Sequence, residues 1–293
     1  MIKQNIAIAY TATGLRTRAA ALAHTLCLPL LDYEEAEQSF LSFSAPSITS
    51  PQFLLTLTPE RLELRQTSKR TKPVYVDFLS PAMLYRLQHS GGNKQLLAKA
   101  VGVKGGYLPT VLDTTAGFGK DACALAALGC KVHMLERSPI IGTLLQDGLA
   151  RLQLAESGGS AALAKIVGNL KQLTLTVGVA QEFISANFAD DCAAINVPDV
   201  IYLDPMYPDE EKEGHKKKKS ALNKEEMRIL RAVVGDDEDV ATVFARALTL
   251  ARKRVVIKRP KNAPYIIAGQ VPQIVYKGNS CRYDVYLRCV NKR

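Results

Sequence analysis

The sequence predicts an α/β protein: a mostly parallel β-sheet with helices on both faces and a C-terminal antiparallel hairpin, preceded by a smaller N-terminal α+β region. Three observations support this fold class. From Leu108 onward, short apolar runs that end in an acidic residue alternate with helix-forming segments. A glycine-rich turn follows the first of these runs, and two β-rich arms close the chain. Such alternation is typical of parallel sheets, whose strands are buried on both faces.

The composition of the 293-residue chain is that of a globular protein with excess positive charge. Hydrophobic residues make up 47% and charged residues 23%, which excludes a disordered or fibrous chain. The 38 Lys and Arg exceed the 28 Asp and Glu, giving a net charge of +10 and a pI of about 9.3. We therefore expect a polyanion, foremost a nucleic acid, as partner.

Nothing in the sequence indicates export or a membrane. The apolar part of the N-terminus is too short for a secretory signal, and no run approaches the roughly 18 apolar residues of a membrane span. The six cysteines contain no Cys-x-x-Cys pair and share no zinc-type spacing with the histidines. We expect reduced thiols, no metal site and a cytoplasmic location.

Residues 1–90 lack the strand, glycine and helix pattern of the rest, so they are predicted to form a small α+β region, with residues 91–293 as the main domain. Two apolar stretches around Pro59 favour a hairpin, and a short alternating stretch favours another strand. Helices are expected on either side of the break at Gly91 and Gly92. The predicted elements are strands at 53–57, 62–65 and 74–78 and helices at 81–88 and 94–101.

In the main domain, the alternating pattern predicts five strands followed by a hairpin. The five strands are expected at 110–113, 131–136, 173–177, 200–204 and 254–258, and the hairpin arms at 273–277 and 282–290. This layout resembles that of the class I S-adenosylmethionine-dependent methyltransferases. The resemblance implies a Rossmann-like, mostly parallel sheet of seven strands.

We interpret the turn at Gly117 and Gly119 as a nucleotide-binding loop. Glycines between a strand and a helix let the backbone approach a ligand, and the start of the helix offers unpaired N–H groups. Glu136 ends the next strand 17 residues after Gly119, close to the roughly 20-residue spacing at which an acidic side chain binds ribose. A tight structural turn is the alternative.

The acidic residues around this loop favour a cationic cofactor. Asp121 lies inside the loop, where a carboxylate suits a sulfonium and an amino group better than a pyrophosphate. Asp113 is expected to bind the loop or the amino group. Ala122 stands where a dinucleotide fingerprint has its third glycine, which disfavours a dehydrogenase. The adenine is expected near Val179 and Ala180, and the pattern as a whole indicates S-adenosylmethionine.

A second motif, Asp204-Pro205-Met206-Tyr207, is interpreted as a clamp for an aromatic amine. The lone pair of such an amine is delocalised, so catalysis must localise and aim it. We expect Asp204 and the Pro205 carbonyl to accept its N–H groups and Tyr207 to stack on the base. The motif resembles the Asp/Asn-Pro-Pro-Tyr/Phe motif of amino-methyltransferases, with Met206 in place of the second proline. An ordinary strand-ending turn is the alternative.

Two basic stretches are expected to contact RNA phosphates. One is a run of four lysines, namely Lys216, Lys217, Lys218 and Lys219. The other, residues 252–261, holds six basic and no acidic residues, and its Lys258 and Arg259 are expected at the ligand edge of the sheet. A solvated surface is the alternative for both stretches.

From about Val74 to its C-terminus the chain resembles the ribosomal small subunit methyltransferase J family, the 16S rRNA guanine-N2 methyltransferases. The stretches that carry the resemblance are 107–109, 113–121, 134–137, 203–208, 219–222, 226–228 and 255–260. By this resemblance, the cofactor is bound by Lys120, Asp121, Glu136, Arg137 and Asp204, and by a pair near Val179 and Ala180.

The resemblance implies methyl transfer from S-adenosylmethionine to the N2 amine of a guanosine in 16S rRNA, free or within the small ribosomal subunit, without a metal. From the residues alone, adenine-N6 or glutamine-N5 methylation stays open. The motif is expected to contact only the amide-like nitrogen, and not the rest of the substrate molecule. A non-catalytic RNA-binding ribosome assembly factor that keeps the fold also stays open.

Overall fold

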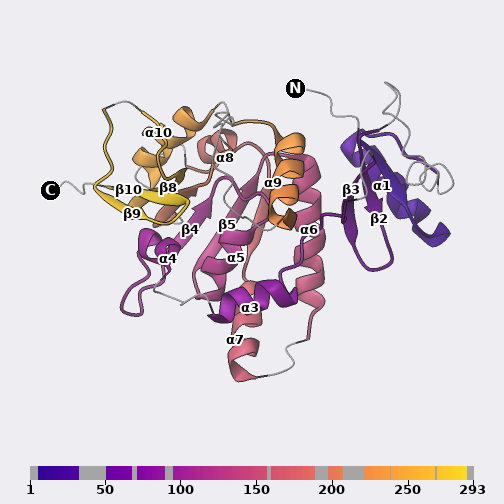
Figure 1. Ribbon diagram of the computed structural model, residues 1–293, viewed down its shortest axis with the longest axis horizontal. Coiled ribbons are helices and arrows are strands. Elements are labelled where there is room, and N and C mark those ends of the chain that lie inside the picture. Colours follow the sequence, from indigo (N-terminus) through magenta and orange to yellow (C-terminus); the bar gives the residue numbers. More distant parts are fainter. Residues whose placement is uncertain are drawn as a thin grey trace.

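The computed structural model describes residues 6–32, 51–67, 71–89, 95–156, 160–188, 197–206, 221–237, 239–267 and 269–288. These residues form one β-sheet of seven strands and one of three (Figure 1). No helix within the described ranges is long and apolar enough to cross a membrane.

The seven-stranded sheet has the strand order β6-β5-β4-β7-β8-β10-β9. Strands β4 to β8 run parallel, whereas β10 pairs antiparallel with both β8 and β9. The strands are β4 Thr110–Asp113, β5 Lys131–Glu136, β6 Thr174–Val177, β7 Val200–Leu203, β8 Arg254–Pro260, β9 Ile274–Lys277 and β10 Cys281–Leu287. The predicted fold class, the five parallel strands and the terminal hairpin are confirmed.

Helices cover both faces of this sheet (Figure 1). The helices of the main unit are α4 Leu96–Val101, α5 Lys120–Ala127, α6 Pro139–Leu154, α7 Ala161–Leu170, α8 Ala180–Asn187, α9 Ala221–Val234 and α10 Val240–Leu250. Within β4, Val111 belongs to the core shared with α5 and α6, whereas Leu112 belongs to the core shared with α8 and α10. Burial on both faces explains the uninterrupted apolar sequence of β7 and of residues 255–257 in β8.

The three-stranded sheet packs beside α6, far from the C-terminal hairpin (Figure 1). Strand β1 (Ile6–Tyr10) is parallel to β2 (Phe53–Leu57), and β2 is antiparallel to β3 (Leu62–Gln66). Helix α1 (Arg16–Leu26) follows β1, and α3 (Pro81–His89) leads into the main unit. The predicted hairpin and the helix at 81–88 are confirmed, whereas β1 and α1 were not predicted. The division at residue 90 stays a prediction.

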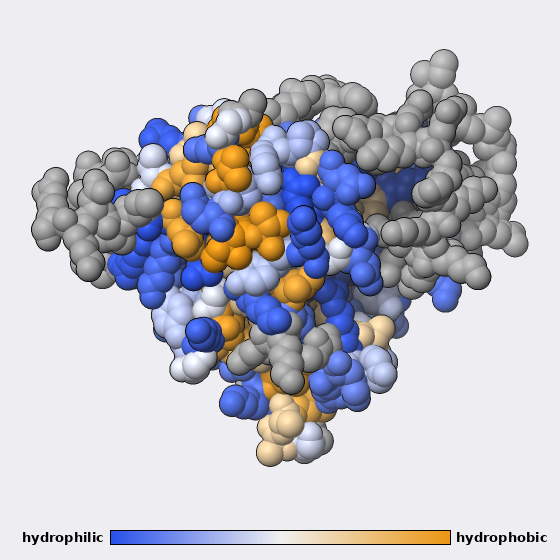
Figure 2. All heavy atoms as spheres, turned by 60° about the vertical axis from the view of Figure 1, so that its left-hand side comes forward, coloured by the Kyte–Doolittle hydropathy of each residue, from blue (hydrophilic) through white to orange (hydrophobic). Residues whose placement is uncertain are grey.

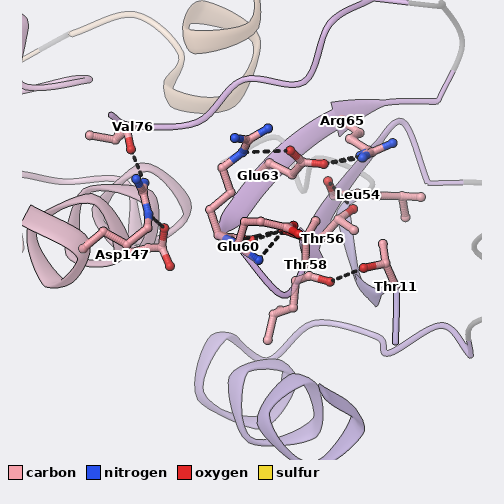
Figure 3. Close-up of polar contacts among 12 residues, drawn as sticks. Thr11, Leu54, Thr56, Thr58, Glu60, Glu63, Arg65, Val76 and Asp147 are labelled. Carbon is pink, nitrogen blue, oxygen red and sulfur yellow. Dashed lines mark hydrogen bonds and ion pairs between the residues drawn. The ribbon is translucent and has the colours of Figure 1, made fainter. Parts of the chain in front are cut away.

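The strand predicted at residues 74–78 is wrong. Val74 makes one isolated bridge to β3, and the residues after it are not in a strand. Val74, Val76 and Phe78 are instead buried in the core that includes α6. The alternating pattern therefore reflects burial against this core and not pairing with a strand. The Val76 carbonyl accepts a hydrogen bond from Arg151 of α6, and not from a neighbouring strand (Figure 3).

Gly148 of α6 lies where this segment crosses the helix. A Cβ there would come within 2.6 Å of a Val76 methyl group and 3.1 Å of the Val76 carbonyl oxygen. We expect Gly148→Ala to lower the free energy of unfolding, because overpacking costs about 1–3 kcal/mol and helix propensity returns only about 1 kcal/mol. Gly168→Ala in α7, where nothing lies within 4 Å of the added carbon, should raise it. Urea unfolding of both variants tests this, and stabilisation by both would contradict the packing argument.

Apolar side chains are exposed on the side of the molecule that carries α10 and the C-terminal hairpin (Figure 2). Leu248, Val271 and Leu287 line an open hollow there. Leu287 ends β10 and pairs with Arg254 at the start of β8. The hollow therefore lies at the amino-terminal edge of the parallel strands, opposite to the edge at which open α/β sheets bind ligands.

Candidate active site

The predicted glycine turn joins β4 to α5. Gly117 and Gly119 have φ angles of 54° and 70°, which glycine adopts without strain. A Cβ at Gly119 would lie 3.1 Å from side-chain atoms of both Leu145 and Phe78. Helix α5 begins directly after Gly119, and within the described residues no side chain caps it. The backbone N–H groups at its start are therefore available to a ligand.

Glu136 ends β5 beside this turn and is buried. Its Oε2 accepts the Gly117 N–H at 2.9 Å, and its Oε1 accepts the Ser138 N–H at 2.8 Å. Burial raises the pKa of Glu136 to about 7, although both hydrogen bonds oppose this shift. Glu136 is thus a buried acceptor in contact with the turn, where the sequence predicts a ribose.

Two carboxylates share one lysine at the carboxyl edge of the sheet. The Lys258 Nζ lies 2.8 Å from Oδ2 of Asp121 and 2.6 Å from Oδ2 of Asp204. The Tyr202 hydroxyl also donates to Asp121, at 2.7 Å. Burial would raise the pKa of Asp121, but Lys258 lowers it overall, whereas partial burial and the neighbouring Asp121 carboxylate raise the pKa of Asp204 to about 6. Lys258 is therefore an internal counter-ion for both carboxylates.

Hydrogen bonds join the carboxyl ends of β4 and β7. The Asp204 N–H donates to Thr115 Oγ1 at 2.6 Å. Thr114 donates to the Tyr202 carbonyl through its N–H at 3.0 Å and its hydroxyl at 3.1 Å. Asp113 is buried in the same junction, and burial raises its pKa to about 8. The Asp204 side chain stays 38% exposed, so the structure brings the two predicted motifs together in one accessible site.

The other residues predicted to bind the cofactor lie at the same edge. Val179 and Ala180 stand at the start of α8, directly after β6, which pairs with β5. Lys120 starts α5 and pairs with Glu226 of α9. Contact of these residues with a cofactor stays a prediction.

Arg137 directs its guanidinium to the turn between α9 and α10. Its Nη2, which carries two N–H groups, lies within hydrogen-bonding distance of three consecutive carbonyls, those of Val234, Gly235 and Asp236, at 3.2, 3.4 and 2.8 Å. The same nitrogen lies 2.9 Å from a carboxylate oxygen of Asp237. Arg137 therefore braces this turn, and its predicted contact with the cofactor is not tested by these bonds.

Only some of the residues predicted to bind the substrate belong to the described part of the chain. Tyr207 and residues 216–219 lie outside the described residues. Pro205 directly follows Asp204 at the end of β7. Arg259 is buried and donates to the Pro264 carbonyl at 2.5 Å. Because the described contacts of Lys258 and Arg259 are internal, their binding to RNA phosphate stays a prediction.

The site also contains residues that the sequence analysis did not identify. Arg86 of α3 lies 3.6 Å from Asp121, and Asp237 accepts the Met206 N–H at 2.6 Å. Arg86 belongs to α3 and Asp237 to the turn after α9, both outside the two motifs, so no local pattern marks them. Thr115 lies inside the glycine motif, and a hydroxyl at that position is a sequence signal for a hydrogen bond at the edge of the sheet.

Comparisons with known proteins agree with this geometry. Residues 41–288 match a family model described as a putative SAM-dependent methyltransferase. The chain is 40% identical over 287 residues to Ribosomal RNA small subunit methyltransferase J of Coxiella burnetii, covering 98% of each protein. It is 45% identical over 242 residues to the protein of the same name from Erwinia tasmaniensis, covering 81% of this chain and 86% of that one.

The fold is similar to a solved structure as well. The crystal structure of a SAM-dependent methyltransferase from Neisseria gonorrhoeae matches with a TM-score of 0.63 and 30% identity, covering 97% of this chain and 96% of that chain. The methyltransferase fold and the cofactor class expected from the sequence are confirmed. The chain therefore belongs to the ribosomal RNA small subunit methyltransferase J family of S-adenosylmethionine-dependent methyltransferases.

Proposed function

We propose that this enzyme transfers a methyl group to the N2 amine of a guanosine in 16S rRNA. The observation that carries the proposal is the position of Asp204 and Pro205, which follow β7 next to the glycine turn, with the Asp204 N–H bonded to Thr115 of that turn. The relatives' name supports a small-subunit rRNA substrate. We also propose that residues 91–293 carry the reaction and that it takes place in the cytoplasm.

The described residues fit S-adenosylmethionine, which supplies an electrophilic methyl group when bound. The glycine turn and the uncapped start of α5 offer backbone N–H groups. Glu136 offers a buried acceptor for ribose hydroxyls. Asp113, whose pKa burial raises to about 8, offers a hydrogen-bonding carboxyl for the amino group, and Asp121 offers a carboxylate at the same edge of the sheet.

Catalysis in this proposal rests on orienting the substrate amine. The Asp204 carboxylate and the Pro205 carbonyl each accept one N–H, which directs the nitrogen lone pair at the methyl group. As the N–C bond forms and the S–C bond breaks, the nitrogen becomes positively charged and loses a proton. Asp204 accepts that proton and passes it to water, a role that its raised pKa suits. Tyr207 stacks on the base.

The excess of 10 positive charges supports an RNA substrate. We propose that Lys216, Lys217, Lys218 and Lys219 neutralise phosphates beside the target nucleotide. Lys258 and Arg259 would first have to give up the internal contacts described above. The main phosphate contacts are therefore assigned to the four lysines.

Incubation with labelled S-adenosylmethionine and small-subunit RNA that lacks the modification, followed by digestion to nucleosides, tests this function. We expect label in N2-methylguanosine. Label in N6-methyladenosine or in protein glutamine would replace the guanine assignment. RNA binding without label would favour an assembly factor.

Binding of the product S-adenosylhomocysteine should tighten as the pH rises from about 6 to about 8. The pKa of Glu136 is raised to about 7, so the carboxyl is largely protonated at the lower pH, and ribose hydroxyls bind the carboxylate form better. Binding should therefore release a proton, measurable by calorimetry in buffers of different ionisation enthalpy. Glu136→Gln should bind more weakly and lose the part of this pH dependence that is centred near pH 7, whereas Asp113, with a pKa of about 8, still titrates. The same pH dependence in Glu136→Gln would show that another group is responsible.

A further inference from the structure

Met206, which replaces the second proline of the clamp motif, is held by a residue from outside its loop. Its N–H donates to Asp237 Oδ2 at 2.6 Å, and its carbonyl accepts the Asp237 N–H at 3.1 Å. A proline at position 206 could not make the first bond, because proline has no N–H. The two reciprocal bonds fix the backbone directly after Pro205.

Asp237 is itself held in place from the cofactor side of the site. Its Oδ1 pairs with Arg137 at 2.9 Å, which leaves Oδ2 for Met206, and its side chain is only 12% exposed. Arg137 directly follows Glu136 at the end of β5 and also binds the three carbonyls before Asp237. Each oxygen of the Asp237 carboxylate thus has its own partner.

The bond to Met206 matters for the neighbouring carbonyl. The Met206 N–H and the Pro205 C=O belong to one planar peptide unit, and the described residues contain no cis peptide bond. In a trans peptide these two groups point in opposite directions, so anchoring the N–H on Asp237 sets the direction of the carbonyl. A hydrogen bond to a carboxylate also polarises the peptide, which makes its carbonyl a better acceptor.

We propose that Asp237 is a positioning residue for methyl transfer. Braced by Arg137, it aims the Pro205 carbonyl at the substrate amine and supplies the rigidity that a second proline would otherwise give. This inference rests on the proposed roles of Asp204 and Pro205. It also accounts for Met206, because the clamp requires a residue with an N–H at that position.

The contact can be measured without RNA or catalysis. The chain has only 5 methionines, so ¹⁵N-methionine labelling gives a simple spectrum in which Met206→Leu assigns the amide. We expect Asp237→Ala to raise hydrogen exchange at Met206 by about 10-fold or more. Asp236→Ala is the matched control, because it removes an exposed carboxylate from the same turn and keeps the carbonyl that binds Arg137. Unchanged exchange in Asp237→Ala would overturn the proposal.

Kinetics separate positioning from general stability. Asp237→Ala should lower kcat by about 10- to 100-fold, with the Kd for S-adenosylhomocysteine nearly unchanged. Asp237→Asn keeps an oxygen acceptor and should recover most of the rate, and Asp236→Ala should resemble wild type. A parallel fall of kcat, cofactor affinity and Tm in Asp237→Ala, or an equal loss of kcat in Asp236→Ala, would contradict positioning.

A Met206→Pro variant tests whether Asp237 affects catalysis through the Met206 N–H. Without an N–H at position 206, Asp237→Ala should cost little further activity, so the two substitutions should be strongly non-additive. A full additional loss would show that Asp237 acts through another contact. If the wild type methylates no guanosine, the proposed function fails, while the exchange measurement still reports on the bond itself.

Discussion

Asp204→Ala is expected to lower the rate of methyl transfer by about 10²- to 10³-fold, with folding and RNA affinity nearly unchanged. The Asp204 carboxylate is the partly exposed acceptor at the end of β7, where it is proposed to hold the amine and take its proton. Folding should persist because Lys258 keeps Asp121 as a partner at 2.8 Å. The substitution therefore leaves no buried ammonium without a counter-ion.

Single-turnover methylation, thermal unfolding and RNA binding measure the three quantities separately. Asp199→Ala is the matched control, since Asp199 directly precedes β7 and binds Thr110 at the opposite edge of the sheet. It removes one carboxylate but should leave the transfer rate nearly unchanged. If Asp204→Ala loses RNA affinity in parallel with methylation, Asp204 acts in binding and the proposed chemical role is wrong.

The fold was predictable where a segment carries its own signal. Strands β4 and β5 begin and end at the predicted residues, because in each strand buried apolar residues lead to a buried carboxyl group, that of Asp113 or Glu136. Residues 74–78 show the limit of this signal. An alternating apolar segment has the same sequence pattern whether it pairs with a strand or only packs against a core. That the Val76 carbonyl accepts a hydrogen bond from Arg151 follows only from the folded structure.

Within the site, residues that share a motif were predicted, and residues that meet only through folding were not. Asp113, Gly119 and Asp121 lie on one strand, turn and helix, so their proximity follows from local geometry. Lys258 lies in a basic stretch, from which we predicted a phosphate ligand. The parallel order β4-β7-β8 instead brings its Nζ between Asp121 and Asp204, a contact that no local sequence pattern encodes.

Replacing Lys258 with methionine is expected to lower the free energy of unfolding by about 3 kcal/mol at pH 8 and by less toward pH 5. In the wild type, Lys258 holds the pKa of Asp121 down. Without the ammonium, burial raises the folded-state pKa of Asp121 and Asp204 above their unfolded values. A carboxyl group whose pKa is raised in the folded state lowers the free energy of unfolding as the pH rises through that folded pKa. The destabilisation by Lys258→Met should therefore grow from acid to neutral pH.

Denaturant titrations at two pH values, beside RNA binding, decide between the two roles of Lys258. Lys253→Met is the matched control, because Lys253 pairs with Asp199 at 3.9 Å on the surface, and such pairs contribute at most about 1 kcal/mol. Adding Asp121→Asn to Lys258→Met should recover stability, since only one carboxyl then needs a counter-ion. Suppose instead that Lys258→Met is as stable as wild type at pH 8 and has weaker RNA binding with a smaller salt dependence. Lys258 would then be a phosphate ligand, and another group would have to neutralise Asp121 and Asp204.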